Sequence, residues 1–172
     1  MKPVSKPEAH EKYQRLIDAA TAAGPVSTAV AHPCDEVSLK GAIEATRLRL
    51  IDPILVGPTA RIQEIARRYD IDISGLRIVN SLHSHDSAAK AVALVRDGEA
   101  DALMKGSLHT DELMGAVVAR EGGIRTSRRI SHCFIMDVPG HPDPLIITDA
   151  AVNIAPTLED KIDIVQLSLI HI

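Results

Sequence analysis

The strongest constraint on the fold is an alternation of short apolar segments with amphipathic ones, repeated four times in the first two thirds of the chain. The apolar segments are Val26–Ala31, Pro53–Val56, Leu76–Asn80 and Ala102–Met104. Each leads through a loop of ordinary length into a segment whose apolar residues recur at helical spacing. Strands that alternate with helices in this way predict a parallel sheet with right-handed crossovers. We therefore expect an α/β fold with three layers, in which helices flank a mostly parallel sheet.

The pattern changes in the last third of the chain. Ile130–Val138 and Leu145–Asp149 are apolar, strand-like segments joined by a short, proline-rich connection. A connection of that length joins antiparallel neighbours, so we expect an antiparallel strand pair and, with the parallel strands, a mixed sheet. Thr157–Asp160 then resembles a capping box at the start of a helix. In that helix Leu158, Ile162 and Val165 are expected to face inward.

Composition excludes several classes of protein. Aromatic residues make up 2% of the 172 residues, so the core must be aliphatic, as suits helices packed on a parallel sheet. A net charge of -4 argues against binding of nucleic acid through phosphate contacts. We find no apolar run long enough to span a membrane, and the polar start, residues 1–12, does not resemble a secretion or transit signal. Two cysteines, Cys34 and Cys133, make no disulfide framework, which favours the cytoplasm.

The polar residues most typical of a binding site follow the fourth apolar segment. They are Lys105, Gly106, Ser107, His109 and Thr110. Thr110 is a plausible N-cap, with Asp111 and Glu112 in the first helical turn. A strand, a glycine-bearing polar loop and a helix start can together bind an anion at the carboxyl end of a sheet. An equally strong alternative is that the loop turns the chain and caps the helix, since Asp111 and Glu112 already offset the helix dipole.

Other candidate groups support weaker hypotheses. His83 and His85 follow a strand and could form a metal pair, but we favour a turn and helix cap. The metal hydrolases with such a start use a barrel of about 250 residues, longer than this chain. Cys34 and Cys133 lie in no recognisable nucleophile motif, so incidental thiols are the simpler interpretation. Asn153 is either a turn residue or a donor to a ligand carbonyl or phosphate.

Three blocks of sequence resemble the phosphate acetyltransferase/phosphate butyryltransferase family. They are Ala102–Thr110, Phe134–Asp137 and Ile147–Thr157, and Pro53–Gly57 and the helix start at Cys34 fit the same order. The resemblance covers about residues 12–166, which we interpret as an incomplete first lobe. It leaves residues 1–11 as a flexible tail and residues 167–172 as a segment foreign to the family. The chain is also similar to the transferase half of bifunctional enoyl-CoA hydratase/phosphate acetyltransferases.

The resemblance implies reversible transfer of a short acyl group, most simply acetyl, between an acyl phosphate and coenzyme A. Coenzyme A is then a substrate, with no bound cofactor and no metal. The fold implied is a lobe like those of isocitrate and isopropylmalate dehydrogenases, in a cytoplasmic enzyme that forms homo-oligomers at full length. The loop Lys105–Thr110 and Asn153 would serve the phosphate end of the acyl phosphate. Arg125, Arg128 and Arg129 are candidates for holding the phosphates of coenzyme A.

Two departures from the family pattern affect these expectations. Where acetyltransferases of the family carry Leu-Arg-Pro, this chain has Leu113–Ala116, which favours phosphate butyryltransferase as an alternative. The Ser-Arg segment and the Asp that the family uses with coenzyme A have no counterpart here, so the catalytic residues are unknown and truncation is expected. A third possibility, from another class, is an inactive α/β fragment that binds a phospholigand.

Overall fold

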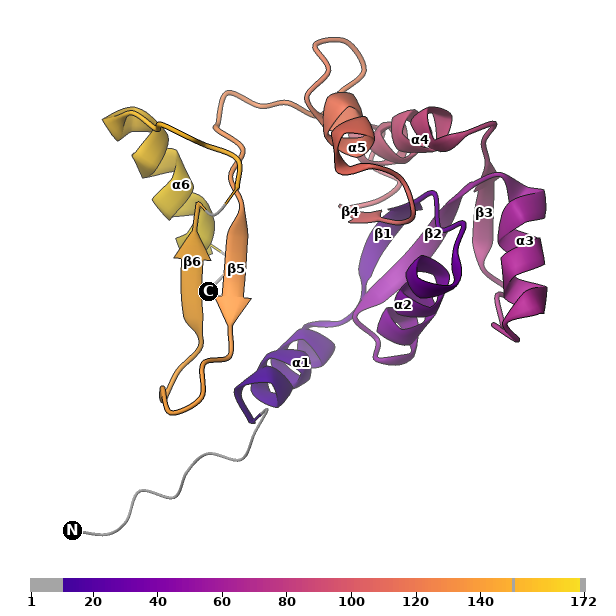
Figure 1. Ribbon diagram of the computed structural model, residues 1–172, viewed down its shortest axis with the longest axis horizontal. Coiled ribbons are helices and arrows are strands. Elements are labelled where there is room, and N and C mark those ends of the chain that lie inside the picture. Colours follow the sequence, from indigo (N-terminus) through magenta and orange to yellow (C-terminus); the bar gives the residue numbers. More distant parts are fainter. Residues whose placement is uncertain (1–10, 150, 171–172) are drawn as a thin grey trace, which may run out of the picture. The chain divides into compact units, whose positions relative to one another are not determined.

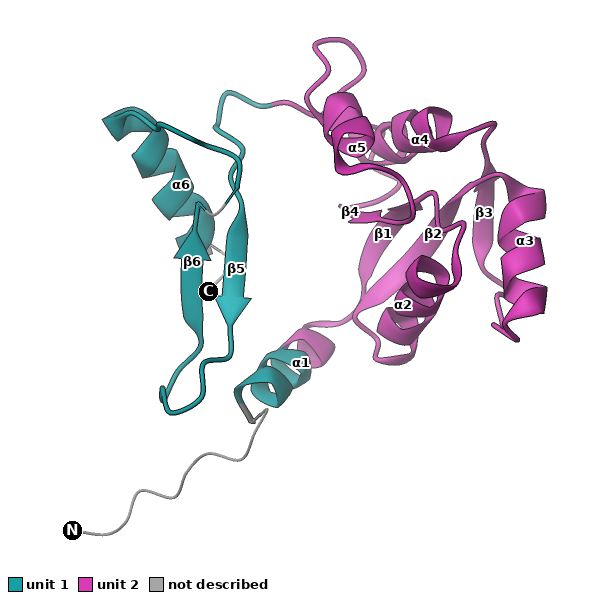
Figure 2. Cartoon of the chain, in the orientation of Figure 1, with its two compact units in different colours: residues 1–19, 126–172 teal, residues 20–125 magenta. Residues whose placement is uncertain are grey.

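The computed structural model describes residues 11–149 and 151–170 of the chain. These residues belong to two compact units (Figure 2). Unit 2 consists of residues 20–125, and unit 1 of residues 1–19 together with 126–172. Helix α1 (Glu11–Ala23) crosses the boundary between the units along the chain. The tail expected at residues 1–11 lies, apart from its last residue, outside the described residues.

Unit 2 is the predicted βα repeat (Figure 1). Its elements are β1 (Val26–Ala31), α2 (Glu36–Arg47), β2 (Ile51–Gly57), α3 (Thr59–Arg68), β3 (Arg77–Asn80), α4 (Ser84–Arg96), β4 (Ala102–Lys105) and α5 (Thr110–Val117). The strands pair in the order β3-β2-β1-β4, and every pairing is parallel. The parallel sheet predicted from the alternation is therefore confirmed.

Two hydrophobic clusters show that helices cover both faces of this sheet. On one face, Val30 and Leu55 pack in a cluster with residues of α2 and α3, such as Leu39 and Ile62. On the other face, Ala29 and Val56 pack in a cluster with residues of α4 and α5. Successive strand residues point to opposite faces, so the buried apolar residues of β1 and β2 contribute to both clusters. The three-layer prediction is confirmed.

The N-cap residues of α2, α3 and α5 define where these helices begin. Asp35 caps α2, since its carboxylate accepts a hydrogen bond from the backbone N–H of Ser38 at 2.8 Å. Pro58 is the N-cap of α3. Thr110, predicted to be an N-cap, is the first residue of α5, and His109 takes the cap position. Glu112 accepts the N–H of His109 at 2.7 Å, which explains the earlier start.

Unit 1 contains the strand pair β5 (Cys133–Met136) and β6 (Leu145–Thr148) with helix α6 (Leu158–Ile170). The pairing is antiparallel, as predicted. The expectation of a mixed sheet is wrong, because β5 and β6 form a sheet of their own among the described residues. The short connection between β5 and β6 predicts that they run antiparallel. No local feature of the sequence shows whether another strand pairs with them. The side chain of Lys12 contacts the connection that follows β5. Its Nζ lies 2.8 Å from Asp137 and 2.6 Å from the carbonyl oxygen of Val138.

The capping box of α6 is present, but its predicted inner face is wrong. The backbone N–H of Thr157 donates to Asp160, and the N–H of Asp160 donates to the Thr157 hydroxyl. Leu158, Ile162 and Val165 are exposed, whereas Ile164 is buried. Helical spacing alone did not show which side of α6 the strand pair would cover.

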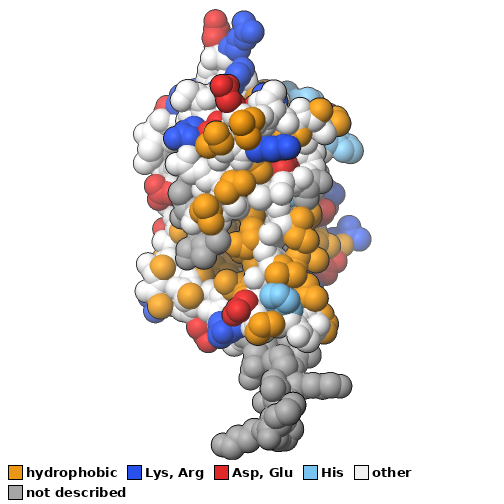
Figure 3. Space-filling view, turned by 90° about the vertical axis from the view of Figure 1, so that its left-hand side faces the viewer, with side chains coloured by type: hydrophobic (Ala, Val, Ile, Leu, Met, Phe, Trp, Pro, Cys, Tyr) orange, Lys and Arg blue, Asp and Glu red, His pale blue; other side chains and the backbone are white. Residues whose placement is uncertain are grey.

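Figure 3 shows hydrophobic side chains gathered at the surface of unit 1. Within the described part of the chain, no helix has the length and apolar character needed to cross a membrane.

Candidate functional site

The strand order places a topological switch point between β1 and β4. From β1 the chain runs outward to β2 and β3, and the crossover through α4 returns it to the other side of β1. In open α/β sheets ligands bind outside the carboxyl ends of the strands at such a point. Two loops meet there, residues 32–35 after β1 and residues 106–109 after β4. We call them the switch-point loops.

Gly106 and Ser107 join the two switch-point loops through their backbones. The N–H of Gly106 donates to the carbonyl of Ala31 at 2.8 Å, and that of Ser107 donates to the carbonyl of His32 at 2.9 Å. A Cβ atom at position 106 would overlap both of these carbonyl oxygens. Gly106 therefore allows an approach that no other residue type permits.

The hydroxyl of Ser107 completes this junction. It donates to the carbonyl oxygen of His32 at 2.9 Å and accepts the backbone N–H of Cys34 at 3.1 Å. Its proton is therefore used within the chain, so the side chain can offer a ligand an acceptor but no donor. The sequence placed Ser107 among the phosphate-binding candidates, and the structure adds this bracing role.

Lys105 supplies the positive charge beside these loops. Its side chain is exposed, and its Nζ lies 3.3 Å from the carbonyl of Gly106. Two hydrogen bonds from Ser38 hold the pKa of Asp35 below its ordinary value, and the charge of Lys105 lowers that pKa further. Lys105 and Asp35 are thus close enough to interact electrostatically, while the ammonium remains open to an anion.

The start of α5 is less suited to an anion than its polar residues suggest. Glu112 accepts hydrogen bonds from the His109 backbone and, at 2.6 Å, from the Ser84 hydroxyl, and it lies 3.1 Å from Nε2 of His85. The Ser84 contact and then the His109 contact lower the pKa of Glu112, so it is ionised at neutral pH. Its charge already offsets the helix dipole. The exposed side chain of Thr110, one residue after the cap, makes no hydrogen bond to any described residue.

The candidate metal pair serves structural roles in this arrangement. The ring of His83 accepts the backbone N–H of Asp86 at 3.3 Å and so caps α4, while His85 contacts Glu112. Across residues 11–149 and 151–170, no group of three or more His, Cys, Asp and Glu side chains is placed to hold a metal ion.

Several predicted site residues lie in unit 1 instead. Asn153 accepts from Nε of Arg129 at 2.8 Å, and its amide donates to the carbonyl of Ile130 and to Asp149. Arg128 lies 2.7 Å from Asp163 in α6. These contacts fasten the segment before β5 to α6. The role of Arg128 and Arg129 toward coenzyme A, like that of the exposed Arg125 in unit 2, stays a prediction.

His32 is the functional candidate that the sequence did not single out. It follows β1, far along the chain from Lys105, and it becomes a neighbour only because β1 pairs with β4. Its φ of 58° turns the chain sharply at the end of the strand. Its carbonyl holds Ser107, and its ring nitrogen Nδ1 lies 2.8 Å from the hydroxyl of Ser87.

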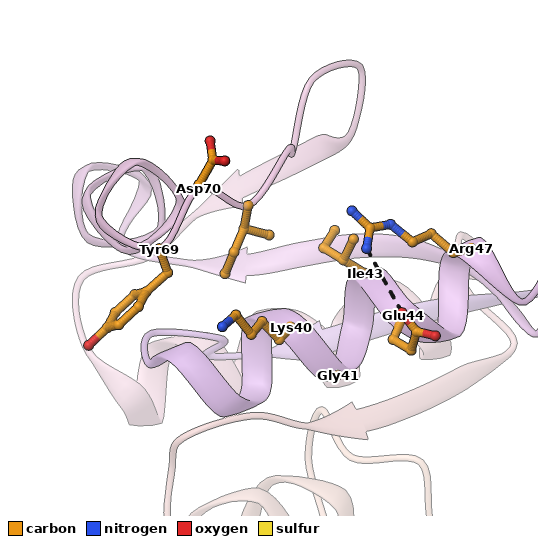
Figure 4. Close-up of a pocket in the computed structure, with 8 residues that line it drawn as sticks. Lys40, Gly41, Ile43, Glu44, Arg47, Tyr69 and Asp70 are labelled. Atoms are coloured by element: carbon orange, nitrogen blue, oxygen red, sulfur yellow. Dashed lines mark ion pairs between the residues drawn. The ribbon is translucent and has the colours of Figure 1, made fainter.

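A separate pocket of about 370 Å³ lies between α2 and the segment after α3 (Figure 4). Lys40 and Arg47 line it together with Glu44 and Asp70, so charges of both signs face the same space. Glu44 lies 3.9 Å from Arg47, the ion pair marked in Figure 4. The pocket includes no residue of the switch-point loops, so a substitution in it can serve as a control for substitutions in those loops.

The strand order defines a parallel α/β protein whose switch-point loops lie at the carboxyl ends of β1 and β4, where open sheets of this kind bind ligands. The family profile described as "Phosphate acetyl/butaryl transferase" matches residues 83–171. The chain belongs to this phosphate acetyltransferase/phosphate butyryltransferase family.

Individual relatives agree with the family profile. A phosphate acetyltransferase of Rhizobium meliloti is 60% identical over 160 residues, which cover 93% of this chain and 51% of that protein. A phosphate butyryltransferase of Clostridium beijerinckii is 36% identical over 142 residues, 83% of this chain and 47% of that protein. The chain spans about half the length of the curated relatives it matches.

A solved structure supports the fold. The phosphotransacetylase of Streptococcus pyogenes aligns with a TM-score of 0.72 at 17% identity, over 86% of this chain and 54% of that one. At that level of identity the likeness shows the fold alone.

Proposed function

We propose that the protein carrying this chain transfers an acetyl group between acetyl phosphate and coenzyme A, and that the switch-point loops hold the phosphate end. The observation that carries the proposal is the 60% identity to a phosphate acetyltransferase across 93% of the chain. The arrangement of Lys105 beside the braced Gly106 and Ser107 supports the assignment of the phosphate site.

The residues of this chain suit binding and orientation. The ammonium of Lys105 offers a charge-assisted hydrogen bond to a phosphate oxygen. The hydrogen bonds of Gly106 and Ser107 to the β1 loop keep the loop in one conformation, so little freedom is lost when a ligand binds. Acyl transfer from a phosphate to a thiol depends on such positioning and on stabilisation of negative charge. Coenzyme A enters as a second substrate, with Arg125, Arg128 and Arg129 as candidates for its phosphates.

Acetyl is the acyl group we favour over butyryl. The acetyltransferase relative shares 60% identity, whereas the butyryltransferase relative shares 36%. This difference outweighs the Leu113–Ala116 segment, which lacks the arginine expected of acetyltransferases. Butyryl transfer remains the alternative within the family. We further propose that the protein is cytoplasmic and forms homo-oligomers; the exposed apolar side chains of unit 1 support the association.

A chimera tests the proposal. This chain replaces the matching half of the Rhizobium meliloti acetyltransferase, and formation of acetyl-CoA from acetyl phosphate and coenzyme A is followed. We expect turnover, with a higher KM for acetyl phosphate in the Lys105→Ala chimera and no such change for Lys40→Ala. A folded chimera that binds acetyl phosphate without transferring the acetyl group would instead support a phospholigand-binding module.

A further inference from the structure

Lys105 differs in its contacts from most other lysines of the described residues. Its side chain is exposed, its Nζ lies 3.3 Å from the carbonyl oxygen of Gly106, and it forms no ion pair with residues 11–149 or 151–170. Three other lysines lie 2.6–2.9 Å from a carboxylate, in the pairs Lys12–Asp137, Lys40–Glu36 and Lys90–Asp86. The amine of Lys105 is therefore available to a ligand at the switch-point loops.

The strand pairing fixes the point from which this side chain extends. Lys105 is the last residue of β4, where it lies opposite Ala31 of β1, and the N–H of Gly106 donates to the carbonyl of Ala31 at 2.8 Å. These backbone contacts hold the Cα atom of Lys105, while the contact of Nζ with Gly106 keeps the amine beside the loop. An anion bound at this loop is therefore within reach of the amine.

Acetyl phosphate carries a reactive carbon next to the group that this site is proposed to hold. One bridging oxygen joins its phosphorus to the carbonyl carbon of the acetyl group, so an amine that binds a phosphate oxygen also lies near that carbon. Groups held together in this way react far faster than the same groups free in solution, and a lysine amine is a nucleophile toward carbonyl carbons. In the proposed reaction the thiol of coenzyme A attacks this carbon. When coenzyme A is absent, the amine of Lys105 is already beside it.

We propose that acetyl phosphate bound at the switch-point loops acetylates Nζ of Lys105 when no thiol is present. This inference rests on the proposed function, because it assigns a modification to the same phosphate site. It makes Lys105 both the cation that binds the phosphate and a slow acceptor of the acetyl group. The state of this lysine then follows the supply of acetyl phosphate relative to coenzyme A.

The atoms and charges of the step balance without a further reactant. The ammonium first gives one proton to water. The nitrogen lone pair then forms a bond to the carbonyl carbon, and the bond from that carbon to the bridging oxygen breaks. The departing phosphate keeps the electron pair of that bond and takes a second proton from the nitrogen. The products are an acetylated lysine, which is a neutral amide, and inorganic phosphate.

Acetylation removes the contribution of Lys105 to phosphate binding. An amide carries no charge, so the charge-assisted hydrogen bond to a phosphate oxygen is lost. The loss of such a bond weakens binding by roughly tenfold or more. The modification therefore inhibits the site at which it forms.

Labelling of the 172-residue chain with acetyl phosphate tests the inference, with Lys161 as the reference. Lys161 lies in α6 of unit 1, and its side chain is exposed and forms no ion pair with the described residues. The chain is incubated with acetyl phosphate at pH 8, because only the neutral amine attacks, and is then cleaved after glutamate. Peptides 100–112 and 160–172 carry one lysine each, and their masses give the two rates. We expect Lys105 to be acetylated at least about tenfold faster than Lys161.

Two controls separate direction by phosphate from ordinary reactivity. Acetic anhydride transfers the same acetyl group but carries no phosphate, so it should modify Lys105 and Lys161 at similar rates. Inorganic phosphate in excess should slow the acetylation of Lys105 by acetyl phosphate and leave that of Lys161 unchanged.

Lys105→Arg tests the consequence for binding, because it keeps a cation at the site without a lysine amine. Affinity for inorganic phosphate is measured by calorimetry before and after incubation with acetyl phosphate. The wild type should bind about tenfold more weakly after incubation, whereas the affinity of Lys105→Arg should be the same before and after.

Each contrary result has a distinct meaning. Equal acetylation of the two lysines by acetyl phosphate, in a chain that binds inorganic phosphate, overturns the modification and leaves the phosphate site intact. A preference for Lys105 that acetic anhydride shows equally, or that inorganic phosphate does not reduce, marks an amine that is reactive by itself and also overturns the inference. Failure of the wild type to bind either inorganic phosphate or acetyl phosphate overturns the phosphate assignment of the loops and the inference together.

Discussion

The hydroxyl of Ser107 donates a hydrogen bond to the carbonyl oxygen of His32 at 2.9 Å, which joins residues 75 positions apart. This bond and the two backbone bonds beside it continue the β1–β4 pairing beyond the ends of both strands. The loop that follows Lys105 is therefore held by hydrogen bonds to the end of β1 and to His32. The candidate site depends on this junction.

Gly106→Ala should destabilise unit 2 strongly. The added methyl group would meet the carbonyl oxygens of Ala31 and His32, so β1 and the loop after β4 would have to separate. We expect a loss of about 2–4 kcal/mol in the free energy of unfolding, measured by urea denaturation. Gly115→Ala is the matched control. Nothing lies within 4 Å of its Cβ position in α5, so that variant should be neutral or gain up to about 1 kcal/mol. Equal effects of the two variants would show that the junction is not tightly packed.

Much of unit 2 was predictable, because its signals are local. Strands such as Val26–Ala31 are short apolar runs, and Asp35 caps a helix within three residues of its own position. The candidate site was less predictable from the sequence. Lys105 and Ser107 were found from their loop, but the role of His32 depends on the β1–β4 pairing, which the sequence does not state.

In unit 1, too, contacts between segments distant in the sequence could not be predicted from local patterns. Its hairpin followed from the short connection, yet the buried side of α6 depends on what packs against it. Ile164 is buried and Leu158 is exposed, although both are apolar residues of one amphipathic-looking segment.

The stability of the chain should depend on pH through His32. Burial lowers the pKa of this side chain in the folded state, while the unfolded chain keeps the ordinary value of 6.5. As the pH falls below about 6.5, the unfolded state takes up a proton that the folded state does not, so the free energy of unfolding falls. His32→Asn cannot titrate and should lose less stability between pH 7.5 and 5.5 in urea denaturation. A steeper loss in the variant would mean that folding raises the pKa of His32.

The two cysteines should differ sharply in reactivity. Cys34 is buried, and burial raises the pKa of its thiol to about 11, whereas Cys133 is exposed. The thiolate is the reactive form, so Cys133 should react with a disulfide reagent at pH 8 much faster than Cys34. Absorbance of the released thiol should show one fast phase that Cys133→Ser removes. A fast phase that survives this substitution would mark Cys34 as a reactive group and revive its candidacy as a nucleophile.

The apolar surface of unit 1 should promote association of the isolated chain. Leu158 is 77% exposed, and Ile162 and Val165 on the same helix are also exposed. Sedimentation velocity should therefore show species larger than a monomer, reduced in Leu158→Ser. Val37→Ser is the control, because Val37 is 80% exposed on α2 in unit 2. Association that responds equally to both substitutions would not involve this surface of unit 1.

Titration of acetyl phosphate into the 172-residue chain tests the central claim most directly, because it asks whether the phosphate site lies at the switch-point loops. Lys105→Ala removes the cation beside those loops, and Lys40→Ala removes a cation from the pocket between α2 and α3. Loss of a charge-assisted hydrogen bond costs about 1.5–3 kcal/mol, so Lys105→Ala should weaken binding by roughly tenfold or more. Lys40→Ala should bind like the wild type. Unchanged affinity in Lys105→Ala, or a loss confined to Lys40→Ala, would contradict the assignment.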